Sequence, residues 1–222
     1  MSDINLGRFD VEGAVAEARA GLSRAELLGA GVGAVAGLLA LARPAAAARL
    51  SATDRAVLNY ALSLEYLQAA FYTEAERSKA IAGEAGKAAS TVGAVERAHV
   101  AAFRDLLGSD AVKRPRFDFR GVTEDRDDFL KTAVAFEDLA VAAYKDQAIR
   151  IESPAVVSAA LGIHTVEARH AAWMRYLNGI KPANAAFDEP DSKRQVLALV
   201  DDTGFVASAP RTTAERMPGF SG

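Results

Sequence analysis

The chain has 222 residues, of which half are hydrophobic and one quarter are charged, a composition typical of one folded domain with tails. The formal net charge of -3 and the lack of any run of Lys or Arg argue against a nucleic-acid-binding surface. The sequence contains no cysteine, which excludes disulfides, zinc–thiolate sites, iron–sulfur clusters and thiol chemistry.

The first notable segment is an uncharged stretch rich in Leu, Ala and Gly over residues 27–42. As a helix it would rise only about 24 Å, short of the ~30 Å hydrocarbon core of a membrane. We therefore expect no stable transmembrane span. Arg24 precedes the stretch, and Arg43 and a run of alanines over 45–48 follow it. This is the layout of an export signal with a cleavage site of small residues.

The segment Ser23–Leu28 resembles a twin-arginine export motif, except that Ala25 stands in place of the second arginine. We expect residues 1–48 to direct export, to the periplasm in a bacterial cell, with cleavage near Ala48. The alternative is a cytoplasmic protein in which the apolar segment is kept. It would then lie on a membrane surface or join copies of the chain into a homo-oligomer.

Two helices are predicted in the first half of the region 49–180, which we expect to form one domain. Ser51 or Thr53 can cap a helix that runs to Ile81, because Ser and Thr accept hydrogen bonds from the first free N–H groups. Gly83 and Gly86 should break that helix. The second helix is expected from about residue 86 to residue 107, before Gly108.

Two further helices follow a connector over residues 113–121 that lacks helical periodicity. Thr123, with acidic residues after it, is expected to start the third helix, which runs to residue 150. Ser153 is the expected cap of the fourth helix, with Pro154 at its first position. That helix should end at Asn178–Gly179.

Four long amphipathic helices without a strand pattern predict an all-α protein, an antiparallel four-helix bundle. The tail over residues 181–222 is expected to add one short helix over 191–200. Beyond Asp201 its composition is that of turns, and we expect that part to be mobile.

A duplicated pattern of polar residues runs through the four helices. Glu65 and Tyr72 in the first helix recur 72 residues later as Glu137 and Tyr144 in the third. The second and fourth helices each carry Glu-x-x-His, and the two copies are 71 residues apart. The ligands predicted from this repeat are Glu65, Glu96, His99, Glu137, Glu167 and His170. One helical hairpin thus occurs twice, related by an approximate twofold axis.

The spacing of these residues suits metal binding. Residues three apart on a helix share a face, so that the Glu and His of one motif can converge on one ion. Four carboxylates and two imidazoles form the di-iron or di-manganese site of helical bundles and balance the charge of two divalent cations. The chain has only three histidines, and two of them lie three residues after a Glu.

The order Glu, Glu-x-x-His, Glu, Glu-x-x-His resembles the ferritin-like superfamily. The segment LNYALSLEYLQAAFY, residues 58–72, is similar to bacterial ferritin-like domain proteins, which are often exported and are related to plant desiccation-related proteins. The resemblance covers about residues 52–202, including AFDEP over residues 186–190. It implies a di-metal site in the bundle core, with Glu96 and Glu167 bridging the two metals.

Other residues near the predicted ligands are candidates for supporting roles. Tyr72 and Tyr144 lie on the ligand face and are candidate catalytic, redox-active tyrosines, or they bind a carboxylate through the hydroxyl. Tyr66 and Asp138 are candidate partners for the histidine ring N–H groups, with solvated surface as the alternative for Asp138. His164 is expected to be a core residue or a residue that supports a ligand, rather than a seventh ligand.

The predicted function is redox chemistry at two Fe ions, with two Mn ions as the alternative. Such a site would oxidise Fe(II) with O2 or H2O2, or remove peroxide. Ala61, Ala133 and Gly93 lie about one turn from ligands, so we expect room for an oxidant there. A protein of another class remains open: a structural or stress-protective bundle that only binds metal.

Overall fold

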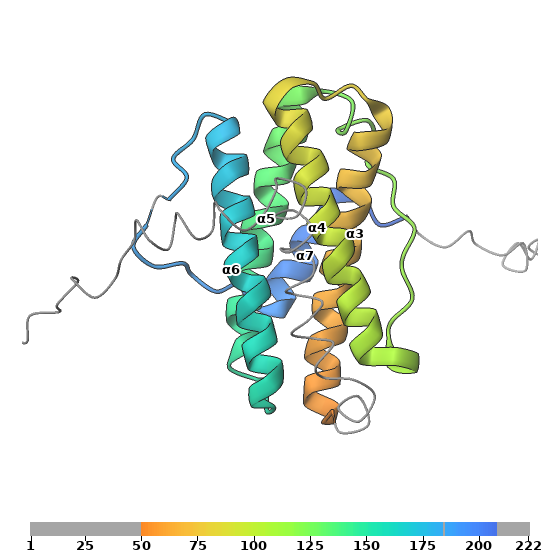
Figure 1. The fold of residues 1–222 in the computed structure, drawn as a ribbon, viewed down its shortest axis with the longest axis vertical. Coiled ribbons are helices and arrows are strands. Elements are labelled where there is room, and N and C mark those ends of the chain that lie inside the picture. The colour runs from red at the N-terminus through yellow and green to blue at the C-terminus, as the bar shows by residue number, and fades with distance from the viewer. Residues whose placement is uncertain (1–49, 184, 208–222) are drawn as a thin grey trace, which may run out of the picture.

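The computed structural model describes residues 50–183 and 185–207. It is built from helices that pack into an antiparallel bundle (Figure 1). The bundle helices are α3 (Ala52–Ser78), α4 (Gly83–Leu107), α5 (Arg126–Ala148) and α6 (Pro154–Leu177). A 3-10 turn, η3 (Gly108–Asp110), follows α4, and a shorter helix, α7 (Lys193–Thr203), follows α6. The expected all-α four-helix bundle is confirmed.

The first bundle helix begins where the sequence indicates. Ser51 is the N-cap of α3, and its hydroxyl accepts a hydrogen bond from the Asp54 backbone N–H at 3.0 Å. The buried Asp54 carboxylate in turn accepts from the backbone N–H groups of Glu152 and Ser153, at 2.8 and 3.2 Å. One acidic side chain therefore ties the start of α3 to the start of α6.

Two of the predicted helix starts are wrong. The helix α4 begins at Gly83 instead of Gly86. Asp125, rather than Thr123, caps α5 through hydrogen bonds from Asp127 and Asp128. The Thr123 hydroxyl is buried and donates instead to Glu74 at 2.9 Å.

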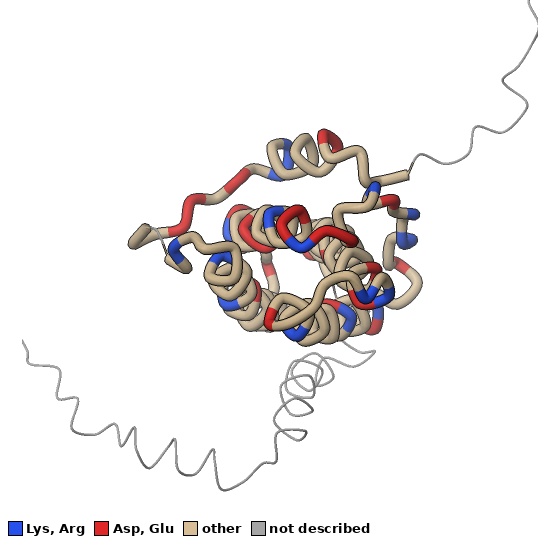
Figure 2. Tube along the Cα trace, turned by 90° about the horizontal axis from the view of Figure 1, so that it is seen from above, with Lys and Arg blue, Asp and Glu red and all other residues tan. Residues whose placement is uncertain are grey.

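The helices form two hairpins, α3–α4 and α5–α6, whose partners contact each other most extensively. Seen from above in Figure 2, the four long helices form a ring and α7 lies outside it. Val196 of α7 is fully buried and packs against Tyr60 and Leu64 of α3 and Ala143 of α5. The short helix thus covers the face shared by α3 and α5.

The connector and the end of the described chain pair with each other. Phe117 and Val206 form an isolated antiparallel bridge, and Asp118 N–H donates to the Phe205 carbonyl at 2.9 Å. Phe119 and Phe205 are buried in the core. The expectation of a mobile tail beyond Asp201 is therefore wrong up to residue 207, because an aromatic ring fixes this segment to the bundle.

None of the helices in the described part of the chain is long and apolar enough to cross a membrane. The segments predicted to direct export, residues 1–48, lie outside the described residues, as do residues 208–222.

Candidate metal centre

The bundle core contains all six residues of the duplicated pattern. Glu65 comes from α3, Glu96 and His99 from α4, Glu137 from α5, and Glu167 and His170 from α6. The four carboxylates and His99 are fully buried, and His170 is 7% exposed. Each Glu-x-x-His pair lies on the inward face of its helix because residues three apart are neighbours on a helical surface.

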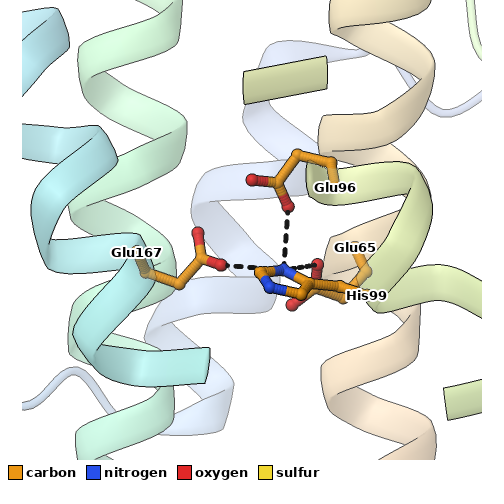
Figure 3. A group of neighbouring side chains, drawn as sticks. All are labelled: Glu65, Glu96, His99 and Glu167. Carbon is orange, nitrogen blue, oxygen red and sulfur yellow. Dashed lines mark hydrogen bonds and ion pairs between the residues drawn. The ribbon is translucent and has the colours of Figure 1, made fainter. Parts of the chain in front are cut away.

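The first group of ligand atoms surrounds His99 (Figure 3). Its Nδ1 atom lies 3.2 Å from Glu65 Oε2, 3.5 Å from Glu96 Oε2 and 3.1 Å from Glu167 Oε1. The three carboxylates that surround this atom come from three helices, α3, α4 and α6. The imidazole nitrogen thus lies inside a ring of three carboxylate oxygens.

The second group surrounds His170 in the same way. Its Nδ1 atom lies 2.9 Å from Glu96 Oε1, 3.6 Å from Glu137 Oε2 and 3.8 Å from Glu167 Oε2. Glu96 and Glu167 therefore belong to both groups, and each presents one oxygen to either histidine. Two ligand clusters share two carboxylates, which is the arrangement of a bridged pair of metal ions.

Several of these buried atoms lack a hydrogen-bond partner within the described part of the chain. They are both carboxylate oxygens of Glu96, one oxygen each of Glu137 and Glu167, His99 Nε2 and His170 Nδ1. His170 Nδ1 and Glu96 Oε1 lie only 2.9 Å apart, yet their geometry makes no hydrogen bond. Leaving buried polar atoms unpaired costs about 1–3 kcal/mol each. His99 Nδ1 is hydrogen-bonded to Glu65 Oε2, but His170 Nδ1 and the unpaired oxygens of Glu96, Glu137 and Glu167 converge without hydrogen-bonding one another. Such a group of atoms fits a shared cation.

The electrostatics of the cluster shift its proton affinities strongly. Burial, together with the charges of Glu167 and Glu65, raises the pKa of Glu96 to about 8. Burial also raises the pKa of Glu137 to about 7, although His170 opposes the shift. Burial alone would raise the pKa of Glu167, but His170 and His99 hold it below its ordinary value. The site therefore holds protons that a cation would displace.

The histidines respond to the same carboxylates. Burial alone would lower the pKa of both imidazoles. The negative charge of Glu65 and contacts with neighbouring carboxylates outweigh burial at His99, and those with Glu137, Glu167 and Glu96 do so at His170. Both pKa values thus lie well above the ordinary value, because the neighbouring carboxylates stabilise the cationic form of each ring.

Tyr72 and Tyr144 bind the ligands across the bundle. The Tyr72 hydroxyl, on α3, donates to Glu137 Oε1 on α5 at 2.5 Å. The Tyr144 hydroxyl, on α5, donates to Glu65 Oε1 on α3 at 2.5 Å. Burial and the adjacent carboxylate raise the pKa of both phenols well above its ordinary value, so both stay neutral. The redox role of these tyrosines stays a prediction.

The structure adds one residue to the site and removes two. Gln68 is buried, and its Nε2 donates to Glu167 Oε2 at 3.4 Å. Its position three residues after Glu65 was the signal that could have revealed it. Tyr66 and Asp138, by contrast, do not bind the histidines: Tyr66 donates to the Val112 carbonyl, and Asp138 pairs with Arg175. The prediction for Tyr66 was wrong, and Asp138, whose side chain is 33% exposed, follows the alternative of a surface residue.

The third histidine, His164, belongs to neither ligand group. Of the three small residues expected to leave room for an oxidant, Ala133 is fully buried in the core cluster of aromatic rings. The space beside Gly93 is taken up by Tyr72 Cβ and a Glu76 oxygen, at 2.8 and 2.5 Å from where a Cβ would lie. Ala61 lines a cavity.

An antiparallel bundle of four long helices with two buried, linked Glu/His clusters defines a class of protein, the helical bundles that can hold a pair of metal ions. The comparison with protein families agrees. The chain belongs to the ferritin-like domain family, whose model matches residues 53–179. No curated protein matches the sequence.

Proposed function

We propose that the bundle binds two redox-active ions, iron or manganese, and uses them to oxidise Fe(II) with O2 or H2O2, or to remove peroxide. The observation that supports this proposal is the sharing of Glu96 and Glu167 between two clusters, each centred on a histidine Nδ1. The ions when bound would supply two electrons, which with two protons reduce O2 to H2O2, or H2O2 to two molecules of water.

The chain's own residues would hold and orient the ions. Glu65 and His99 would serve one ion, Glu137 and His170 the other, and Glu96 and Glu167 both. Each tyrosine hydroxyl bonds one carboxylate oxygen, Oε1 of Glu137 or of Glu65. The other oxygen of each carboxylate would then be available to a metal ion. Gln68 donates to Glu167 Oε2 and so helps to hold that carboxylate in its orientation between the two histidines. The surrounding helices exclude water from the carboxylates, all of which are fully buried.

The donor set favours iron or manganese. Carboxylates suit hard divalent ions, imidazole suits iron, and the sequence contains no thiolate that would select copper(I) or zinc. The second candidate is a stress-protective bundle in which metal only stabilises the fold. Its supporting observation is the number of unpaired buried polar atoms, which bound metal would satisfy without any reaction.

The number of ions tests the shared ligands. Elemental analysis of fully loaded protein should give two ions per chain. Glu96→Ala should lose both, because its carboxylate takes part in both clusters. Glu65→Ala should keep one, because Glu65 takes part in only one of them. Equal losses in the two variants, or a wild type with one ion or none, would contradict the di-metal proposal.

Oxidant consumption separates the redox role from the structural one. Wild type loaded with Fe(II) without air should consume oxidant in proportion to its sites and gain ferric absorbance. Loaded with Mn(II), it should release O2 from H2O2 by converting two molecules to O2 and two of water. The double variant His99→Ala, His170→Ala should do neither while keeping its helical circular dichroism. Wild type no more active than this variant would leave the structural role.

A further inference from the structure

An apolar cavity of about 20 Å³ is lined by side chains of α3, α4, α5 and α6. It is large enough for one small molecule, since a single water needs about 10–15 Å³. Tyr144 forms part of its wall, and the hydroxyl of that side chain donates to Glu65 at 2.5 Å. One aromatic side chain therefore contacts both the cavity and a proposed ligand.

The duplicated hairpin explains why the cavity occurs on one side. With the offset of 72 residues between α3 and α5, three cavity-lining positions correspond to phenylalanines in the other half. Ala143 corresponds to Phe71, Val57 to Phe129, and Leu64 to Phe136. Phe71 lies 5.2 Å, centroid to centroid, from both Phe129 and Phe136. One half of the core is therefore filled by rings, and the other keeps a space.

The lining selects the kind of molecule that can enter. Nearly all of the surface that faces the cavity is carbon. The polar ends of Tyr144 and Gln147 are engaged with Glu65 and Asp146. The Tyr60 hydroxyl has no hydrogen-bond partner within the described residues, but almost no polar surface faces the cavity. H2O2 would lose its hydrogen bonds to water there, at a cost of the same order as that of any buried hydroxyl. O2 has no such bonds to lose, and small apolar cavities take up apolar gases.

We propose that this cavity binds dioxygen beside the metal centre, so that O2 rather than H2O2 is the oxidant that the protein admits by this route. The inference rests on the proposed function. In the reaction that follows, one O2 takes two electrons from two Fe(II), which become Fe(III), and two protons from solvent, giving H2O2.

The test fills the cavity without touching a ligand. Ala160 lines it and is partly exposed, so Ala160→Leu adds three carbons there. Ala155, on the same helix but exposed and outside the lining, provides the matched control Ala155→Leu. Each variant is loaded with Fe(II) without air and mixed with O2 or, separately, with H2O2. Ferric absorbance is followed in stopped flow.

Ala160→Leu should slow the reaction with O2 roughly tenfold or more and leave the reaction with H2O2 unchanged. Ala155→Leu should change neither. Crystals of wild type under xenon pressure should show the gas beside Ala143 and Tyr144, and crystals of Ala160→Leu should not. The xenon result does not depend on metal or activity.

The outcomes separate the two proposals. Fully loaded wild type that reacts with neither oxidant would overturn the proposed function. Reaction with O2 at equal rates in Ala160→Leu and Ala155→Leu, or equal slowing with O2 and H2O2, would overturn only the dioxygen cavity. Absence of xenon from the wild-type cavity would do the same.

Discussion

The hydroxyl groups of Tyr72 and Tyr144 each reach across the bundle to a carboxylate of the other helical hairpin. Tyr144→Phe would leave Glu65 Oε1 buried without its donor, which costs about 1–3 kcal/mol. We therefore expect the free energy of unfolding of the metal-loaded protein, measured in urea, to fall by about that amount. Tyr176→Phe is the control, because Tyr176 is 68% exposed and its change should stay within about 0.5 kcal/mol. If Tyr144→Phe and Tyr176→Phe lowered the free energy of unfolding equally, the proposed role of the Tyr144 hydroxyl at the site would be wrong.

The protons stored on the carboxylates predict an unusual dependence of stability on pH. In the metal-free fold the pKa of Glu137 is about 7 and that of Glu96 about 8, both above the ordinary 4.5. Between pH 4.5 and these raised pKa values, the folded state binds more protons than the unfolded state. The free energy of unfolding therefore falls as the pH rises through 7 and 8. The raised pKa values of His99 and His170 act in the same direction.

Calorimetry with a chelator should therefore show the melting temperature falling between about pH 5.5 and pH 9. The fall should be at least roughly 2–4 °C, the effect of about 1 kcal/mol in a domain of this size. Saturating metal should remove or reverse the trend, because cations compete with the protons and bind more tightly as the pH rises. If metal-free protein became more stable over this range, the prediction that the buried carboxylates hold protons would be wrong.

Residue spacing was sufficient to predict the six buried carboxylate and imidazole side chains, since a Glu-x-x-His pair has to lie on one helical face. It could not show which helix each tyrosine binds, because a ring two turns from a ligand can point along its own helix or across the bundle. Tyr66 and Asp138 were misplaced for a related reason. They follow Glu65 and Glu137 directly and so point about 100° away from the ligand face.

At the scale of helices, the close contact between α3 and α4 depends on Gly93. A Cβ there would lie 2.8 Å from Tyr72 Cβ and 2.5 Å from a Glu76 oxygen, so α4 would have to move away from the site. Gly93→Ala should lower the free energy of unfolding by about 1–3 kcal/mol. Gly162, in α6, has no atom within 4 Å of its Cβ position, so Gly162→Ala should raise that free energy by about 0.5–1 kcal/mol. Urea unfolding of both variants measures the two changes in the free energy of unfolding. Changes of the same sign would contradict the claim that the contact between α3 and α4 depends on Gly93.

The four long helices and their order along the chain could be predicted because amphipathic periodicity is strong over such long segments. The starts of α4 and α5 could not, because they depend on tertiary contacts. Thr123 is an acceptable cap by residue type, but its hydroxyl is used by Glu74, and Asp125 can then cap α5 through two N–H groups. The chain beyond Asp201 was misjudged because local composition does not reveal that Phe205 meets Phe119 at 5.5 Å.

At the scale of the whole molecule, we propose that the chain is exported, on the strength of the apolar stretch 27–42 and the alanines at 45–48. Cell fractionation with N-terminal sequencing should find the mature protein outside the cytoplasm, starting near Ala48 or Arg49. The bundle should be intact after cleavage, because its first cap is Ser51. A cytoplasmic protein that keeps Met1–Ala48 would refute processing and favour a role for that segment in assembly.

The crossed tyrosine contacts also bear on the symmetry of the fold. Tyr72 binds Glu137 while Tyr144 binds Glu65, so these two contacts are reciprocal between the hairpins. This reciprocity is the signature of a twofold interface between identical subunits. The domain is therefore arranged like a homodimer of hairpins, with residues 111–125 as the connection between the two. Neither hairpin could complete a cluster alone, because Glu167 of the second hairpin completes the group around His99 and Glu96 of the first completes the group around His170.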